Sequence, residues 1–260
     1  MVSSIKYLGG KRNEIQYFKK YIPDFDLYVE PFLGGGSVLF NLLPEKAIVN
    51  DYDKLLIDYW KSVKYNCNDL IKEIKKYENK IDKDSYYIVR EMYNKGMVKN
   101  KEAFYFYINR IGFGGLIRKN KKGEINTPYR QSIKLDRYYN IIKQNSNCLK
   151  NVKINNKGYK IFLNKLEKEN IINNKTFIFI DPPYLETYDY NLNSNNKVLE
   201  IYKYLYKYIK NTDGKVMIVT KESEIINKMF NGYIIDKYNK NYVINPNKIK
   251  STKHLIITNY

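Results

Sequence analysis

Histidine and cysteine are scarce in this chain, and their scarcity excludes several kinds of chemistry. His254 is the single histidine among 260 residues, which excludes most histidine-based catalysis and the histidine-ligated zinc of nucleobase deaminases. Cys67 and Cys148 stand far apart in the sequence, without the spacing of metal ligands. We therefore expect two reduced thiols in an intracellular protein and no resident metal.

Long apolar runs are also absent. No stretch approaches the roughly 18–20 apolar residues that span a bilayer, and residues 1–6 lack the apolar core of a signal peptide. Hydrophobic residues still make up 43% of the chain, enough for a sizeable buried core. The composition therefore predicts a globular protein.

Negative charge is in short supply, since the formal net charge is +19. A lysine-rich solvated surface would explain part of this excess, but the arginines are more discriminating. Four of the six arginines lie between positions 110 and 137, and arginine is the preferred bidentate partner of guanine edges and phosphates. The charge pattern favours a nucleic-acid partner, because phosphate neutralisation dominates such affinity.

The most informative stretch is Asp181-Pro182-Pro183-Tyr184, which follows the apolar run 176–180. That run predicts a buried strand, and open α/β sheets bind ligands at the carboxyl ends of their strands. The prolines stiffen the loop. The Asp181 carboxylate and the Pro182 carbonyl can accept hydrogen bonds from the two N–H groups of an amino group on a flat base. Tyr184 can stack on the ring of that base. The alternative is an ordinary proline turn after a strand.

Residues 27–40 predict a strand, a glycine loop at Gly34 to Gly36, and then a helix that Ser37 would cap. No glycine follows at the third position after Gly36, and no Gly-Lys-Ser/Thr follows, so neither the dinucleotide fingerprint nor the P-loop is present. Asp51 comes after the strand-like residues 47–49, where an acidic side chain is placed to bind ribose hydroxyls.

The remaining sequence alternates strand-like and helix-like stretches at both ends, with a helical region between them. Residues 53–110 predict helices. Residues 111–130 predict a hairpin or loop with basic flanks. The asparagine-rich pieces 144–156 and 191–196 predict surface loops. The further strands are predicted at Ala47–Asn50, Val152–Asn155, Phe177–Ile180, Lys215–Thr220, Gly232–Asp236 and His254–Asn259.

Four blocks in this order resemble the Dam-like DNA adenine-N6 methyltransferases, which use S-adenosyl-L-methionine. The blocks are residues 6–12, 30–37, 109–129 and 181–184, and residues 255–260 resemble the family's last strand. The resemblance implies a Rossmann-like class I methyltransferase fold with a mixed seven-stranded sheet. It also implies a catalytic, cofactor-binding domain over residues 1–52 and 152–260, and an inserted, mainly helical DNA-recognition domain over 53–151.

The resemblance also implies roles for individual residues. The catalytic loop is Asp181, Pro182, Pro183 and Tyr184. The cofactor residues are Tyr7, Lys11, Glu30, Pro31, Phe32, Gly34, Gly36, Ser37, Asp51 and Asp181. The DNA-binding residues are Arg110, Phe113, Gly114, Leu116, Arg118, Asn126, Pro128, Tyr129 and Arg130. Among these, Arg118 would read a guanine in double-stranded DNA, and Phe113 and Leu116 would approach or wedge between bases.

The chain departs from the family pattern at four places. Tyr7 replaces the usual tryptophan, Asn155-Asn156 stand where an acidic residue often contacts the cofactor's adenine, and Gly114 replaces an asparagine. The segment 185–196 also differs from the usual continuation. GATC is therefore the leading target sequence, but the departures affect the residues that would read it.

Two other functions remain compatible with the sequence. A catalytically silent DNA-binding protein could keep this fold, although the intact Asp181–Tyr184 loop argues against it. Methylation of adenine in RNA is the other alternative, and the block at 109–118 argues for DNA instead.

Overall fold

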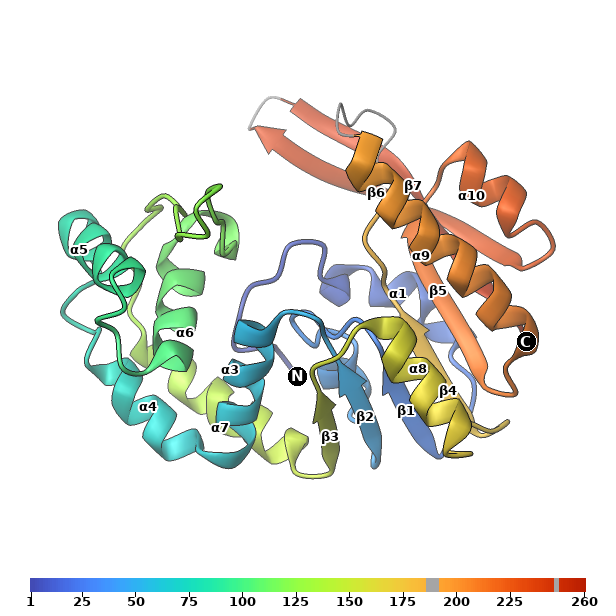
Figure 1. Cartoon of the computed structure of the whole chain (residues 1–260), viewed down its shortest axis with the longest axis horizontal. Coiled ribbons are helices and arrows are strands. Elements are labelled where there is room, and N and C mark those ends of the chain that lie inside the picture. Colours follow the sequence, from blue (N-terminus) through green and yellow to red (C-terminus); the bar gives the residue numbers. More distant parts are fainter. Residues whose placement is uncertain (186–191, 246–247) are drawn as a thin grey trace. The chain divides into compact units, whose positions relative to one another are not determined.

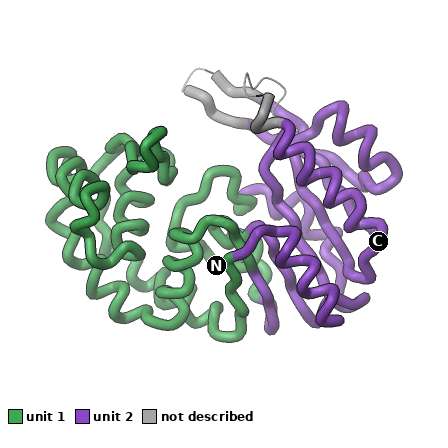
Figure 2. Tube along the Cα trace, in the orientation of Figure 1, with its two compact units in different colours: residues 1–12, 33–43, 50–156 green, residues 13–32, 44–49, 157–260 purple. Residues whose placement is uncertain are grey.

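The computed structural model describes residues 1–185, 192–245 and 248–260. Its backbone divides into two compact units (Figures 1 and 2). Unit 1 comprises residues 1–12, 33–43 and 50–156, and unit 2 comprises residues 13–32, 44–49 and 157–260. Each unit is assembled from segments that are distant in sequence, so each depends on long-range packing.

The strands form a mixed sheet of seven in the order β3-β2-β1-β4-β5-β7-β6. β1 pairs in parallel with β2 and β4, β4 pairs in parallel with β5, and β7 is antiparallel to both β5 and β6. The predicted α/β fold with a mixed seven-stranded sheet is thus confirmed. The bounds are β1 Leu27–Glu30, β2 Ala47–Asn50, β3 Val152–Asn155, β4 Thr176–Ile180, β5 Lys215–Lys221, β6 Ile234–Asn245 and β7 Lys248–Thr258.

The core of unit 2 explains why its central strands are apolar throughout. All five residues of β4 are buried, as expected for a parallel strand that is covered on both faces. Val29 in β1 pairs with Ile178 in β4, so both strands end at the same edge of the sheet. The helices of unit 2 are α1 Ile15–Phe18, α8 Tyr159–Lys168, α9 Leu192–Asn211 and α10 Glu224–Met229, with a short 3-10 helix at Lys19–Tyr21.

Unit 1 is mainly helical, and three of its helices, α3, α5 and α6, begin at polar capping residues. Asp53, Asp82 and Asn100 each accept backbone N–H bonds at a helix start, which satisfies donors that the helix leaves unpaired. The α-helices are α2 Leu39–Leu42, α3 Lys54–Tyr65, α4 Cys67–Lys75, α5 Lys83–Asn94, α6 Lys101–Ile111 and α7 Tyr139–Leu149. Short 3-10 helices lie at Lys11–Asn13, Phe113–Gly115 and Asp136–Tyr138. The helices predicted over residues 53–110 are therefore present.

Three sequence-based expectations about these elements are wrong. The asparagine-rich piece 144–156 is not a loop but the end of α7 followed by β3. Asn145 is buried there and accepts a hydrogen bond from the Ser4 N–H at 2.8 Å, so tertiary contacts satisfy its polar side chain. Of the predicted loop 191–196, Leu192 already starts α9, and residues 186–191 lie outside the described ranges. Strands β6 and β7 extend well beyond their predicted lengths.

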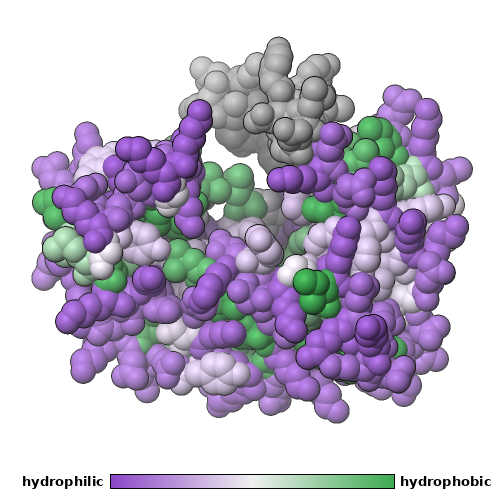
Figure 3. Space-filling view, viewed as in Figure 1, coloured by the Kyte–Doolittle hydropathy of each residue, from purple (hydrophilic) through white to green (hydrophobic). Residues whose placement is uncertain are grey.

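The surface agrees with the strongly basic composition. Figure 3 shows hydrophilic side chains over most of the face that it displays. Within the described ranges, no helix combines the length and the apolar character needed to cross a membrane.

Candidate functional site

The glycine loop of unit 1 is held by side chains on both sides of Gly34. The Gly34 N–H donates a hydrogen bond to Asp51 Oδ2 at 2.8 Å, and the Gly34 carbonyl accepts one from Trp60 Nε1 at 3.0 Å. Gly34 adopts a φ of 49°, in the left-handed region that costs other residues free energy. Asp51 is itself oriented by the Asp53 N–H, which donates to Oδ1 at 3.0 Å. The carboxylate therefore lies directly against the loop that the sequence predicted to approach a ligand.

Tyr7 packs against this loop. A Cβ atom added at Gly34 would lie 2.7 Å from Tyr7 Cε1, and one added at Gly35 would lie 2.7 Å from Tyr7 Cβ. These distances are too short for a side chain, so only glycine allows the ring to lie here. Tyr7 remains 44% exposed, which leaves aromatic surface available beside the loop.

Lys11 is not an ordinary surface lysine. Its residue is only 1% exposed, whereas lysine is almost never buried without a partner. The ammonium donates to the Gly9 carbonyl at 3.0 Å. Lys11 is thus held in the same glycine-containing segment as Tyr7, within unit 1.

Asp51 carries a perturbed carboxyl group. Burial raises the pKa of Asp51, while hydrogen bonds from the Asp53 and Gly34 N–H groups act in the opposite direction. Tyr52 directly follows it and is 83% exposed. The sequence analysis did not select Tyr52, although an aromatic residue next to the acidic strand end was a usable signal for a stacking surface.

Asn156 supports the end of β2. Its side-chain amide donates to the carbonyls of Asp51 at 2.8 Å and Tyr52 at 3.1 Å. The asparagine that stands in for an expected acidic residue is therefore already bonded to the backbone that carries Asp51. Ser37, in contrast, does not cap the helix as predicted, because α2 begins at Leu39 with Val38 in the capping position and no side-chain cap.

In unit 2, the Asp181–Tyr184 loop follows β4 and is anchored from α9. Tyr202 donates to the Pro183 carbonyl at 3.1 Å and also hydrogen-bonds Thr220 of β5. Tyr184 donates to Asp181 Oδ1 at 3.4 Å, which brings the first and last residues of the loop together. The loop is thus tied to two neighbouring elements as well as stiffened by its prolines.

Glu30 at the end of β1 lies near this loop. β1 and β4 are parallel neighbours, so Glu30 and Asp181 lie at the same edge of the sheet. Burial raises the pKa of Tyr28, and the negative charges of Glu30 and Asp181 raise it further. Glu30 and Pro31 are buried. Phe32 stacks on Tyr159 of α8 with ring centroids 5.3 Å apart. Unit 2 therefore brings its predicted residues together around the carboxyl ends of β1 and β4.

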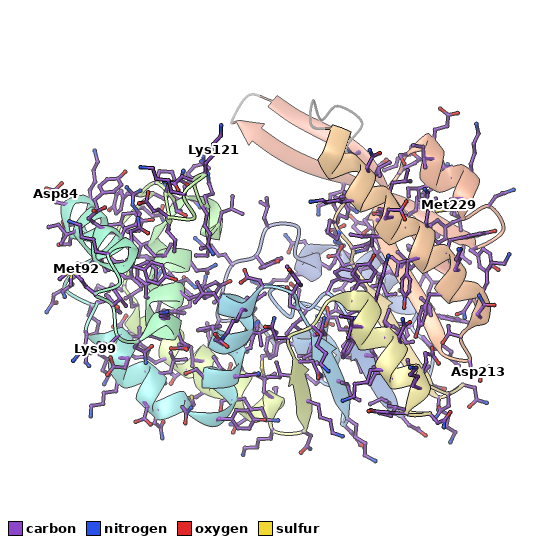
Figure 4. The ribbon with its side chains drawn as sticks, viewed as in Figure 1. Asp84, Met92, Lys99, Lys121, Asp213 and Met229 are labelled. Carbon is purple, nitrogen blue, oxygen red and sulfur yellow. The ribbon has the colours of Figure 1, made fainter. Side chains whose placement is uncertain are left out.

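Residues 112–129 of unit 1 fold back on themselves in an irregular hairpin. Antiparallel bridges join Gly112 to Tyr129 and Lys119 to Ile125. Thr127 crosses the hairpin, since its Oγ1 donates to the Leu116 carbonyl at 2.8 Å and accepts from the Arg118 N–H at 2.9 Å. Figure 4 shows Lys121 projecting from the tip. Phe113, Arg118, Asn126 and Arg130 are exposed, and Gly114, Leu116, Pro128 and Tyr129 are partly buried.

Arg110 does not belong to this exposed set, which corrects the expectation that it contacts DNA. It is 5% exposed, and its guanidinium donates to the carbonyls of Ser3 and Ser4. It also lies 4.0 Å from the ring centroid of Tyr138. With its donors directed at the backbone in the interior, Arg110 holds the N-terminal segment in place rather than meeting a phosphate.

Asn109 is a buried residue that the sequence analysis left without a role. Its Oδ1 accepts from the Lys6 N–H at 2.8 Å. Its amide donates to the carbonyls of Lys6 at 2.8 Å and Gly115 at 2.7 Å. Asn109 thereby sets the distance between the segment that carries Tyr7 and the turn that carries Phe113. Both segments belong to unit 1.

No group of three or more metal-ligating side chains occurs in the part of the chain that the structure describes. The candidate site residues described above offer carboxylate, ammonium, hydroxyl, aromatic and backbone groups. This set suits the binding and orientation of organic groups by hydrogen bonds and stacking.

Comparison with known proteins gives one consistent result. Residues 7–244 match the family of D12 class N6 adenine-specific DNA methyltransferases. The type II methyltransferase M.CviBI of Paramecium bursaria Chlorella virus NC1A is 29% identical, over 98% of both chains. The type II methyltransferase M.MjaIII of Methanocaldococcus jannaschii is 28% identical, also over 98% of both chains. The DNA adenine methylase of Escherichia coli K12 is 32% identical over 48% of this chain and 46% of that protein.

Proposed function

Because the chain belongs to the D12 class of N6 adenine-specific DNA methyltransferases, we propose that it methylates a flipped adenine within a specific sequence of double-stranded DNA. S-adenosyl-L-methionine is the proposed methyl donor, and GATC is the leading candidate site. The observation that carries the proposal is the Asp181–Tyr184 loop, which follows a buried strand and is anchored through Tyr202.

The catalytic argument starts from the weak nucleophilicity of adenine's amino nitrogen, whose lone pair is delocalised into the ring. The Asp181 carboxylate and the Pro182 carbonyl accept its two N–H bonds and favour a more tetrahedral nitrogen. Asp181 also stabilises positive charge as the nitrogen attacks, while Tyr184 stacks on the base. Such catalysis rests on orientation and preorganised electrostatics. Extruding the base from the duplex costs a few kcal/mol.

The residues of unit 1 fit the proposed methyl donor. When bound, S-adenosyl-L-methionine supplies an electrophilic methyl group on a sulfonium ion. Asp51 offers carboxylate oxygens to ribose hydroxyls beside a loop with no room for side chains at Gly34 and Gly35, and Lys11 supplies a cation for a carboxylate. The other proposed cofactor residues are Tyr7, Gly36 and Ser37 of unit 1 and Glu30, Pro31, Phe32 and Asp181 of unit 2. Tyr52 adds an exposed aromatic surface for stacking.

The hairpin at 112–129 is the proposed DNA reader. Arg118 and Phe113 are exposed on it, which suits a guanine contact and an aromatic wedge. Arginine presents a fork of donors that matches the O6 and N7 acceptors of guanine. We assign DNA recognition to this hairpin within residues 53–151, and cofactor binding and catalysis to residues 1–52 and 152–260.

The test is to incubate purified protein and S-adenosyl-L-methionine with duplex DNA that contains every short sequence, and then to map N6-methyladenine by sequencing. Asp181→Ala serves as the inactive control, and an RNA of the same sequence serves as a second substrate. Methylation confined to GATC supports the proposal in full, and another sequence overturns only the assignment of GATC. Methylation of RNA alone, or DNA binding without methylation, would replace the proposed function with one of the two alternatives.

A further inference from the structure

The chain's single histidine is buried in unit 2 beside a glutamate. His254 lies on β7, is fully buried, and places Nδ1 2.9 Å from Oε2 of Glu14. The Glu14 side chain is only 4% exposed. A buried carboxylate costs several kcal/mol unless charged or hydrogen-bonding partners compensate for its lost hydration. The side chains around Glu14 must therefore offset the cost of burying its carboxylate.

Besides His254, two side chains of β6 contact the Glu14 carboxylate. Tyr238 donates to Oε2 at 2.7 Å, and the Lys240 ammonium pairs with Oε1. Tyr238 stands opposite His254 in the β6–β7 ladder, and Lys240 follows it on the same strand face two residues later. The Glu14 cluster, defined as Glu14, Tyr238, Lys240 and His254, is thus a buried polar network built from three separate segments.

The Glu14 cluster contacts the proposed catalytic loop through His254. The His254 ring meets the Tyr184 ring in a T-shaped contact, with centroids 5.3 Å apart and planes at 81°. Tyr184 in turn hydrogen-bonds Asp181 at 3.4 Å. A chain of contacts therefore runs from Glu14 through His254 to Tyr184. The loop's own prolines restrict the backbone of Asp181 and Pro182 but do not set the orientation of the Tyr184 ring.

We infer that His254 is a positioning residue for Tyr184, a role that rests on the proposed function. The Glu14 carboxylate lies 2.9 Å from Nδ1 of the imidazole, and the imidazole in turn sets the angle of the Tyr184 ring. The ring then presents a defined face to the target base. Side chains that hold reacting groups need neighbours that lock their rotamers, and His254 supplies that restraint.

The contacts of the imidazole with Glu14 and with Tyr184 are separable by substitution, although the ring also packs against Tyr238 with centroids 5.6 Å apart. His254→Asn keeps a nitrogen donor near the position of Nδ1 but removes the ring that meets Tyr184. His254→Phe keeps a ring against Tyr184 but removes the nitrogen that lies against Glu14. Leaving a buried polar group without its partner is the more costly loss for folding. If the ring positions Tyr184, His254→Phe should be the more active of the two variants, and His254→Asn should be the more stable.

The experiment measures kcat, KM for DNA, and melting temperature for wild type, His254→Asn, His254→Phe and Leu166→Ala. Leu166 is buried in the unit 2 core, so its variant reports the effect of destabilisation alone. We expect His254→Asn to lower kcat roughly 3–10-fold, the size of one lost aromatic contact, with KM nearly unchanged. We expect His254→Phe to stay within about twofold of wild-type kcat but to melt at a lower temperature than His254→Asn.

A second readout does not depend on turnover. A DNA duplex with 2-aminopurine at the target position, bound in the presence of S-adenosylhomocysteine, should show a changed fluorescence when the flipped base stacks on Tyr184. His254→Asn should alter that signal, and in a Tyr184→Ala background it should add no further change.

Two outcomes would overturn the inference. If kcat follows melting temperature across all variants, including Leu166→Ala, His254 has a purely structural role. If both His254 variants keep wild-type kcat and wild-type fluorescence, the imidazole does not orient Tyr184. A wild-type protein without methyltransferase activity would instead overturn the proposed function itself, so the two failures are distinguishable.

Discussion

The two units hold their functional loops by different physical means. In unit 2, the Asp181–Tyr184 loop extends from β4, whose five residues are all buried, and its prolines and Tyr202 restrict it further. In unit 1, the glycine loop is held by polar groups, since Gly34 lies between Asp51 and Trp60. One loop takes its rigidity from an apolar core, and the other takes it from individual hydrogen bonds to the backbone.

This difference explains where each unit should be sensitive to substitution. Apolar burial is spread over many residues, so the backbone position at the end of β4 does not depend on one contact beneath it. The unit 1 loop relies on one glycine conformation and a few bonds, and a single added methyl group would disturb it. The same holds for the hairpin at 112–129, where Thr127 and Asn109 each hold backbone groups. The predictions below test this comparison.

Asp181→Ala should give the largest effect, with a loss of kcat of about 10³-fold, because the variant lacks an acceptor preorganised for the reacting amino group. Affinity for DNA and for S-adenosyl-L-methionine should change little. Single-turnover methylation and separate binding titrations check this result. Asp213→Ala, at an exposed position of unit 2 away from the loop, is the matched control. Near-normal turnover by Asp181→Ala at saturating cofactor would refute the catalytic assignment.

Gly34→Ala should weaken cofactor binding by about 2–4 kcal/mol, from left-handed backbone strain and overpacking. The new methyl group would lie 2.7 Å from the Tyr7 ring. Calorimetry with S-adenosyl-L-methionine measures this loss. The control is Gly158→Ala, because Gly158 has a φ of −61° and no atom within 4 Å of an added Cβ. Equal affinities for the two variants would contradict the tight packing of unit 1.

Arg118→Ala should relax sequence choice at one guanine by about 1–3 kcal/mol. Lys121→Ala, at the tip of the same hairpin, should instead lower affinity about equally for all sequences and flatten the salt dependence. Methylation of oligonucleotides varied one base at a time separates these outcomes. If Arg118→Ala keeps the wild-type preference at every position, Arg118 contacts phosphate. The reader of the sequence would then have to be sought in residues 185–196.

The smallest effect should be a pH dependence of cofactor binding. Burial raises the pKa of Asp51, and the ribose hydroxyls need the ionised carboxylate. The contribution of Asp51 to affinity is therefore present above its raised pKa and is lost as the pH falls through it, at a higher pH than an ordinary aspartate would require. Calorimetry as a function of pH should show this decline for wild type and a flat profile for Asp51→Asn. If wild type and Asp51→Asn show the same dependence of affinity on pH, Asp51 does not bind the ribose.

Several features of the site could be predicted because they are local in sequence. The Asp181–Tyr184 loop follows its own apolar strand, and the glycine loop follows β1. In both cases the position of the loop after a strand can be predicted from neighbouring residues, namely proline, glycine and the apolar strand. The helices over residues 53–110 follow from apolar spacing in the same way.

Other features could not be predicted, because they depend on partners that are distant in the chain. The family resemblance implied that Arg110 binds DNA, but the carbonyl of Ser4, which lies 106 positions away, accepts a hydrogen bond from its guanidinium in the interior. The loop expected at 144–156 is helix and strand because Asn145 finds a partner in the Ser4 N–H. Local polarity did not show that long-range hydrogen bonds would satisfy these groups.

The sequence by itself thus determined the α/β fold, the family, and the two loops proposed to carry the chemistry. The tertiary structure alone decided which charged side chains face solvent and which are buried. It turned Arg110 into a support for the N-terminal segment, and it brought Glu14 and His254 together behind Tyr184. The physical reason is that burying a charged group is favourable only where compensating partners meet it. The packing of distant segments decides where those partners lie.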